Sequence, residues 1–212
     1  MIVKPHQTAP KPAQMGAEAS TLTADSIATA ARMAAKMAAD GKGMPPVHAW
    51  NPPFCGDLDI RIARDGTWFY LGTPIGRPEL ARLFSTILKR EGDAYFLVTP
   101  VEKVGIRVDD APFLAVDFTV TGEGTAQVLT FVTSMGDHAV AGPANPIRVA
   151  RDADSDEPAP YVHIRAGLEA RIDRKSFYRL VDIGADHDGW FGLWSQGAFF
   201  PVIPSSEMDA TP

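Results

Sequence analysis

Two carboxylates in the run Asp57-Leu-Asp59 come closest to a chemical motif in this sequence. Alternate residues of a β-strand point to the same face, so both carboxylates would project from one side. Such a pair can bind a divalent cation or act as general acid and base. The same spacing recurs at 152/154, 154/156 and 186/188, so a solvated strand face that pairs with Arg61 is the simpler interpretation.

The other reactive residue types lack the neighbours that catalysis or metal binding requires. None of the five histidines has a second His or Cys at metal-ligand spacing. Neither Ser134 nor Ser195 has the glycine two residues earlier that a nucleophile elbow needs, and the run Asp186-His-Asp-Gly189 is typical of a turn. Cys55 has no histidine nearby in sequence, and no Gly-rich phosphate loop occurs. We therefore predict no catalytic residue, no metal site and no cofactor.

Aromatic and basic residues could form a recognition surface instead. Trp68, Phe69 and Tyr70 are consecutive, so Trp68 and Tyr70 share one face of a strand and Phe69 lies on the other. One of these faces is expected in the core. The other would join residue types that are enriched in binding hot spots, namely Trp50, Arg61, Arg77 and Arg82. Alternatively, Arg77 and Arg82 brace the fold.

The elements that would position these residues begin with a β-hairpin. Apolar and polar residues alternate over 57–62, and the turn residues 64–66 lead into a second strand. Apolar residues at helical spacing then predict a helix in which Pro78 lies near the first turn. The predicted elements are strands at 57–62 and 67–71, a helix at 74–89, and strands at 95–99 and 104–108.

The second half of the chain repeats this kind of pattern. Long strands at 113–121 and 126–134 come first, and an acidic loop over 151–160 follows. Glycine turns at 166–167 and 196–197 each join two strands, and Asp173 is an N-cap. The predicted elements are strands at 161–165 and 168–172, a helix at 173–181, and strands at 190–194 and 198–202.

A short sequence match indicates that the two halves are related. Residues 75–84 resemble 172–181, and the matched Ile, Arg and Leu positions are separated by one offset, 172−75 = 97. The element order β-β-α-β-β also recurs. We therefore predict an α+β fold with two related domains from an internal duplication, over 45–111 and 112–204.

Both ends of the chain are predicted to lie outside these domains. Residues 1–44 should form a flexible tail and a short Ala/Met-rich helix over 25–39, with Thr23 as N-cap and Gly41 as a stop. The small apolar face of this helix is expected to dock on the body of the protein, or alternatively to form an oligomer contact. Residues 205–212 should form a loose tail.

Charge and composition limit the classes of partner. The chain has 20 Lys+Arg against 26 Asp+Glu and no basic cluster, so nucleic acid is excluded as a predicted partner. The single cysteine is typical of a reducing compartment. No segment reaches the roughly 20 apolar residues that span a bilayer, so we predict a cytoplasmic protein without membrane insertion. The oligomeric state stays open.

The run from Cys55 to Arg77, together with Leu97–Lys103 and Val108–Phe113, resembles the bacterial domain-of-unknown-function family 1285. The resemblance implies a duplicated core of two α+β domains, of which the second is similar to pleckstrin-homology folds. It further implies a polypeptide ligand between the domains, a part in signal transduction and no catalytic residues. The characteristic polar residues of the family fall on Asp57, Asp59, Arg61, Asp65, Trp68, Arg77, Glu102, Lys103, Asp109 and Asp110.

Together these patterns support one main hypothesis and one alternative. The main hypothesis is a non-enzymatic binding protein that holds a peptide or protein between its two domains. The alternative is a metal-dependent hydrolase that uses Asp57 and Asp59. The predicted ligand-binding residues are Asp57, Asp59, Arg61, Trp68, Arg77, Glu102 and Lys103.

Overall fold

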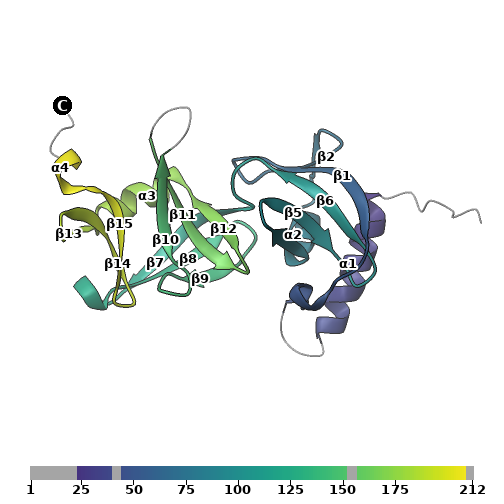
Figure 1. Cartoon of the computed structure of the whole chain (residues 1–212), viewed down its shortest axis with the longest axis horizontal. Coiled ribbons are helices and arrows are strands. Elements are labelled where there is room, and N and C mark those ends of the chain that lie inside the picture. Colours follow the sequence, from purple (N-terminus) through teal and green to yellow (C-terminus); the bar gives the residue numbers. More distant parts are fainter. Residues whose placement is uncertain (1–22, 40–43, 152–156, 209–212) are drawn as a thin grey trace, which may run out of the picture.

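The protein consists of two lobes that lie side by side (Figure 1). The structure is a computed structural model, and it describes residues 23–39, 44–151 and 157–208. The first lobe contains one six-stranded sheet, here sheet A, and the second contains a six-stranded sheet B and a three-stranded sheet C. The fold is therefore a mixed α+β fold, as predicted.

Sheet A has the strand order β3-β2-β1-β6-β5-β4. Its first and last strands, β1 and β6, pair in parallel at the centre, and all other neighbours pair antiparallel. The strands are β1 (Phe54–Ile62), β2 (Trp68–Tyr70), β3 (Thr73–Pro74), β4 (Leu88–Glu91), β5 (Ala94–Val98) and β6 (Lys103–Val108).

Sheet B has the same topology, with the order β10-β11-β12-β7-β8-β9. Its first and last strands, β7 and β12, again form the parallel central pair between two antiparallel meanders. The strands are β7 (Phe113–Thr121), β8 (Val128–Thr133), β9 (His138–Val140), β10 (Ile147–Arg151), β11 (Pro158–Arg165) and β12 (Leu168–Ile172). The protein thus contains two similar six-stranded units, β1–β6 and β7–β12.

The repeated unit in the structure differs from the predicted β-β-α-β-β unit. The offset of 97 pairs helix α2 (Pro78–Thr86) with helix α3 (Arg174–Val181), but α2 lies inside the first unit and α3 follows the second. The offset also matches Leu83 with Leu180, whereas the fully buried large apolar side chain is Phe84 on α2 and Leu180 on α3. Two short amphipathic helices can share an apolar spacing whatever their origin, so the match does not define the repeated unit.

Sheet C closes the far end of the second lobe. It consists of β13 (Ala185–His187), β14 (Trp190–Ser195) and β15 (Ala198–Pro204), and the short helix α4 (Ser205–Met208) follows it. The buried Ser195 hydroxyl joins sheet C to sheet B, because it donates to the Ala141 carbonyl (2.7 Å) and accepts from the Leu129 amide (3.0 Å). The predicted strands at 190–194 and 198–202 are therefore present, in a sheet of their own.

Helix α1 (Ala24–Ala39) packs on the first lobe, as the apolar face of the predicted helix suggested. Its residues Ala24, Ile27, Ala28 and Ala31 are buried in the main core cluster. Thr23 caps the helix by accepting from the Ser26 amide (3.2 Å). The predicted tail over 1–20 and the predicted stop at Gly41 lie outside the described residues.

Several element boundaries differ from the sequence prediction. Helix α2 begins at Pro78 and ends at Thr86, because the residues after Ile87 pair with β5 as strand β4 instead of continuing the helix. Strands β10 and β11 extend into both ends of the predicted loop 151–160. Ser205–Met208 are helical where a loose tail was predicted. The predicted Asp173 N-cap is confirmed, since its carboxylate accepts from the Ser176 amide (2.7 Å).

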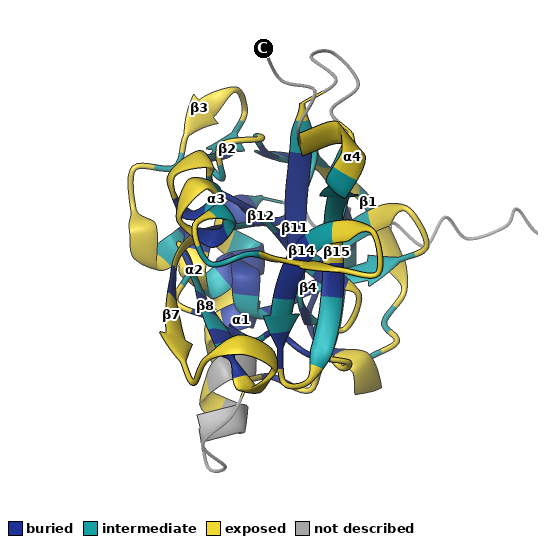
Figure 2. Cartoon of the chain, turned by 90° about the vertical axis from the view of Figure 1, so that its left-hand side faces the viewer, coloured by how far each residue is buried: buried dark blue, intermediate teal, exposed yellow. Residues whose placement is uncertain are grey.

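Buried side chains of both lobes form one continuous core cluster. Figure 2 shows β11 buried along most of its length, in agreement with its continuous apolar run. At the contact between the lobes, the Arg165 guanidinium donates to the buried Asp137 carboxylate and to the Ser85 carbonyl in α2 (both 2.8 Å). A bilayer-crossing helix needs a long apolar stretch, and the described residues contain no helix of that kind.

Candidate binding groove

Two adjoining hollows lie across strands β1, β6 and β5 of sheet A, with volumes of about 580 and 340 Å³. Both are lined by Asp57, Ala94, Tyr95, Gly105 and Ile106, so they form one continuous depression. We call this depression the groove. Its remaining lining residues are Phe54, Leu58, Asp59, Ile60, Asp93, Phe96, Lys103, Arg107 and Val108.

The groove lies on the outer face of sheet A, away from the core. Asp57 pairs with Gly105 and Gly105 pairs with Phe96, so these three residues share one face of the sheet. The alternate residues Leu58 and Ile60 point to the opposite face, where they are buried in the core. The strand alternation predicted for 57–62 is thereby confirmed.

Gly105 forms the floor of the groove. A Cβ at this position would collide with the Asp57 carboxylate, which lies directly over the glycine. Because Gly105 has no side chain, the backbone of β6 is open at the point where Asp57 crosses it. The glycine therefore creates both the depression and the position of the carboxylate.

Two of the three carboxylates that line the groove, Asp57 and Asp59, are exposed and unpaired among the described residues. Within the described ranges, the Asp57 and Asp59 side chains have neither a hydrogen bond nor an ion pair. Nearby cations are already paired, since Lys103 Nζ lies 2.9 Å from Glu91 and Arg61 Nη1 lies 2.8 Å from Asp109. The hydrogen bond from Lys103 holds the pKa of Glu91 below its ordinary value. The groove thus offers two carboxylates that are available to a ligand.

Aromatic rings form one wall of the groove. Phe54 contacts Phe96 edge to face at a centroid distance of 6.1 Å, and Lys103 Nζ lies 4.9 Å from the centroid of the Phe96 ring. The Phe54 side chain is 55% exposed, which is unusual for a residue of its size. Such a ring offers apolar contact and a face for a cation.

The groove brings together three of the predicted binding residues. Asp57, Asp59 and Lys103 line it, and Arg61 lies on the same sheet face. Arg61 is engaged elsewhere, because its guanidinium pairs with Asp109 and lies 4.7 Å from the centre of the Phe69 ring. The face predicted for the two carboxylates therefore exists as an open surface.

The other three predicted residues lie apart from the groove. The prediction of Trp68 as an exposed aromatic anchor is wrong. Trp68 is 3% exposed and stacks on Phe84 at a centroid distance of 6.2 Å, so it is a core residue. Arg77 directly precedes α2 and lines a separate hollow of about 290 Å³. Glu102 lies in the turn between β5 and β6, where its carbonyl accepts from the Thr99 amide.

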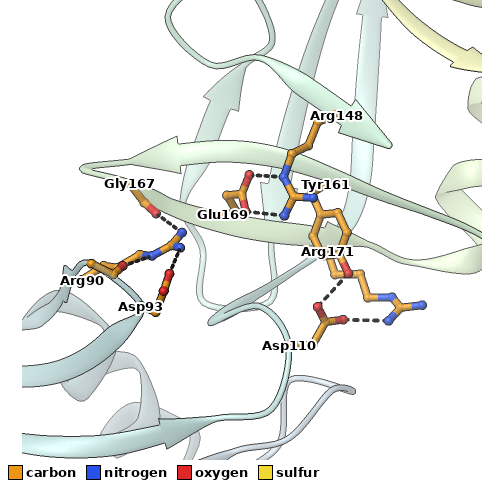
Figure 3. Close-up of polar contacts among 9 residues, drawn as sticks. Arg90, Asp93, Asp110, Arg148, Tyr161, Gly167, Glu169 and Arg171 are labelled. Carbon is orange, nitrogen blue, oxygen red and sulfur yellow. Dashed lines mark hydrogen bonds and ion pairs between the residues drawn. The ribbon is translucent and has the colours of Figure 1, made fainter. Parts of the chain in front are cut away.

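Charged groups at the contact between the domains are mutually satisfied (Figure 3). Asp110 accepts from the Tyr161 hydroxyl and pairs with Arg171, both at 2.7 Å. Arg148 pairs with Glu169 through two hydrogen bonds of 2.6 Å, which raise the pKa of the arginine. The outer face of sheet B therefore presents paired charges to the first domain, unlike the outer face of sheet A.

One end of the groove reaches this domain contact. The β4–β5 turn carries Asp93 on the groove side, and Arg90 of the same hairpin donates to the Gly167 carbonyl of the second domain (3.3 Å; Figure 3). Burial raises the pKa of Tyr95 at this end. The lining residues all belong to the first domain, which differs from the predicted position between the domains.

Sequence reasoning missed the residues that shape the groove. Phe54 precedes the predicted strand, and Gly105 and Phe96 were part of predicted strands without an assigned role. An isolated glycine inside a strand is a signal of close approach, and it could have identified Gly105. Within the described residues, no group of three or more His, Cys, Asp or Glu side chains is arranged to hold a metal ion.

These observations define a two-domain α+β protein with two similar six-stranded units and an open groove on the first. The chain belongs to the DUF1285 family, matching the N-terminal domain of this family of unknown function over residues 45–111 and the C-terminal domain over 112–202.

Two solved structures of DUF1285 family proteins are similar to the chain. One, from Silicibacter pomeroyi DSS-3, is 65% identical with a TM-score of 0.80 and covers 86% of this chain and 97% of its own. The other, from Shewanella baltica OS155, is 32% identical with a TM-score of 0.46 and covers 59% of this chain and 91% of its own. No curated protein matches the chain.

Proposed function

We propose that this protein is a non-enzymatic binding protein that holds an extended segment of a polypeptide in the groove on sheet A. The observation that carries the proposal is the combination of unpaired carboxylates, the exposed Phe54 ring and an open glycine floor along one continuous depression. Aromatic anchors beside placed polar groups are typical of peptide-binding surfaces. An extended peptide also fits a groove that crosses three adjacent strands.

The rest of the family resemblance is part of the same proposal. The groove ends beside the domain contact, so a longer ligand would extend from the first domain onto the second. A part in signal transduction, a cytoplasmic location and a likeness of the second domain to pleckstrin-homology folds stay predictions.

The experiment is a selection of peptides from a random display library, followed by calorimetric titration of the enriched peptides. Gly105→Ala is the test variant, since its Cβ displaces the Asp57 carboxylate and fills the floor. Gly76→Ala is the matched control, because a Cβ at Gly76 meets no atom within 4 Å. We expect Gly105→Ala to weaken binding about tenfold, the equivalent of ~1.4 kcal/mol, and Gly76→Ala to leave it unchanged.

Two results would contradict the proposal. One is a selection that enriches no peptide above background. The other is a set of enriched peptides that bind Gly105→Ala and wild type equally, which would place the binding surface elsewhere.

The hydrolase alternative has a separate test. Magnesium is often held by one or two carboxylates together with substrate oxygens, and Asp57 and Asp59 offer two such ligands on one face. That alternative predicts that Mg²⁺ or Mn²⁺ raises the melting temperature and that Asp57→Asn abolishes the increase. An unchanged melting temperature would count against it.

A further inference from the structure

The charges around the groove indicate which ligand it takes, given the proposed function on which this inference rests. Asp57 and Asp59 lie at its centre without partners among the described residues. Three of the neighbouring cations lie close to a carboxylate: Lys103 to Glu91 (2.9 Å), Arg61 to Asp109 (2.8 Å) and Arg90 to Asp93 (3.5 Å). Asp57 and Asp59 are therefore the lining carboxylates that remain available to a ligand.

Two lining cations, Arg107 and Lys103, weaken the attraction of the groove for a basic ligand. The Arg107 side chain is 70% exposed, and its Nε lies 4.0 Å from an Asp109 carboxylate that Arg61 already holds more closely. Arg107 lines the larger hollow together with Asp59 and lies outside the smaller one. The smaller hollow contains Asp57, the aromatic wall and Lys103, whose Nζ lies 2.9 Å from Glu91 and 4.9 Å from the centroid of the Phe96 ring. Phe54 is therefore the ring of this hollow that is available beside Asp57.

We propose that the groove selects extended polypeptide segments that carry a basic side chain, lysine or arginine. The cationic head would lie between the Asp57 and Asp59 carboxylates, and the aliphatic stem would cover Phe54. This arrangement combines charge complementarity with contact between a cation and an exposed ring. It also uses the snorkelling geometry of long basic side chains, whose stems bury while their heads stay solvated.

The probes are three peptides of equal length, blocked at both ends, with alternating Thr-Lys, Thr-Gln or Thr-Glu. Alternation in an extended peptide presents every second side chain to the sheet. We expect wild type to bind Thr-Lys tightest and Thr-Glu weakest in calorimetric titrations. The preference for Thr-Lys should decrease with ionic strength, because exposed charges are screened.

The double variant Asp57→Asn/Asp59→Asn tests the position of the charges. We expect it to bind Thr-Lys about fivefold more weakly, as expected for two exposed ion pairs, and to bind Thr-Gln like wild type. The matched control Glu123→Gln/Asp182→Asn changes the net charge equally at exposed positions outside the groove, and should leave both affinities unchanged. Arg107→Gln should strengthen Thr-Lys binding, an effect of opposite sign.

Each outcome separates this inference from the proposed function. Equal binding of Thr-Lys and Thr-Gln, both weakened by Gly105→Ala, overturns the selection for basic side chains and leaves the polypeptide groove standing. Equal loss of Thr-Lys binding in the control double variant also overturns the selection, since attraction would then depend on net charge. Binding of none of the three peptides overturns both.

Discussion

The outer faces of sheets A and B differ although the two sheets share one topology. On sheet B, Arg148 and Glu169 neutralise each other and Arg171 pairs with Asp110. On sheet A, Asp57 and Asp59 have no such partners within the described part of the chain. Two sheets of the same topology therefore have different outer faces: that of sheet B contributes to the contact between the domains, and that of sheet A is open to a ligand.

The largest expected effect is a difference in stability between variants of Asp110, at the domain contact, and Asp57, on the open face of sheet A. Asp110→Ala removes a carboxylate that binds both Tyr161 and Arg171, so we expect a loss of about 2 kcal/mol in the free energy of unfolding. Asp57→Ala should change it by less than ~0.5 kcal/mol, because its side chain is exposed and unpaired. Urea denaturation measures both. Equal losses would show that the faces do not differ as described.

A smaller effect is expected for the tyrosine on sheet B. Tyr161→Phe should cost about 1 kcal/mol at neutral pH, because the hydrogen bond to Asp110 is lost. Burial and this hydrogen bond raise the pKa of Tyr161 above 10.0. The folded state therefore retains the proton, and stability falls as the pH rises from 10.0 toward the higher folded-state pKa. In thermal melts, the melting temperature of Tyr161→Phe should therefore fall less steeply than that of wild type as the pH rises above 10.0.

Tyr95 in the groove is the matched control for Tyr161. Burial raises the pKa of Tyr95 too, so Tyr95→Phe should also lose less stability than wild type at alkaline pH. Its hydroxyl has no hydrogen-bond partner in the ranges that the structure describes, so stability at neutral pH should be nearly unchanged. A large decrease in the free energy of unfolding of Tyr95→Phe at neutral pH would contradict the proposed difference between the two faces.

The smallest effect is expected at the rim of the groove. Lys103 and Lys89 bond Glu91 and hold its pKa below the ordinary 4.5. Stability from this cluster is present above that pH and is lost as the pH falls through the lower folded-state pKa. As the pH falls, Glu91→Gln and Lys103→Gln should each lose slightly less stability than wild type. If Lys103→Gln loses as much stability at acid pH as wild type, the effect depends on Lys89 alone.

Much of the fold could be predicted because local signals agree with the tertiary structure. Glycine turns identified the β11–β12 and β14–β15 hairpins, and Asp173 marked the start of α3. Strand β4 could not be separated from α2, because Ile87 and Leu88 continue the helical spacing of apolar residues. The repeated unit predicted from the offset of 97 differs from the observed unit for a related reason, since amphipathic spacing in short helices recurs without duplication.

The candidate groove could be predicted only in part. The sequence placed Asp57 and Asp59 on one solvated strand face, which the structure also shows. It could not decide which face of β2 is buried, because Trp68 and Phe69 are both aromatic and alternation alone has no direction. Nor could it show that Gly105 lies beside Asp57, since a parallel pairing between distant strands has no local signal.

The contact between Asp57 and Gly105 has an evolutionary consequence. A side chain at position 105 and a carboxylate at position 57 compete for the same space, so each residue limits the substitutions that the other tolerates. Among relatives of this chain, a larger residue at 105 should occur together with a smaller residue at 57. The two positions, 48 apart in sequence (105−57), would then evolve as one unit.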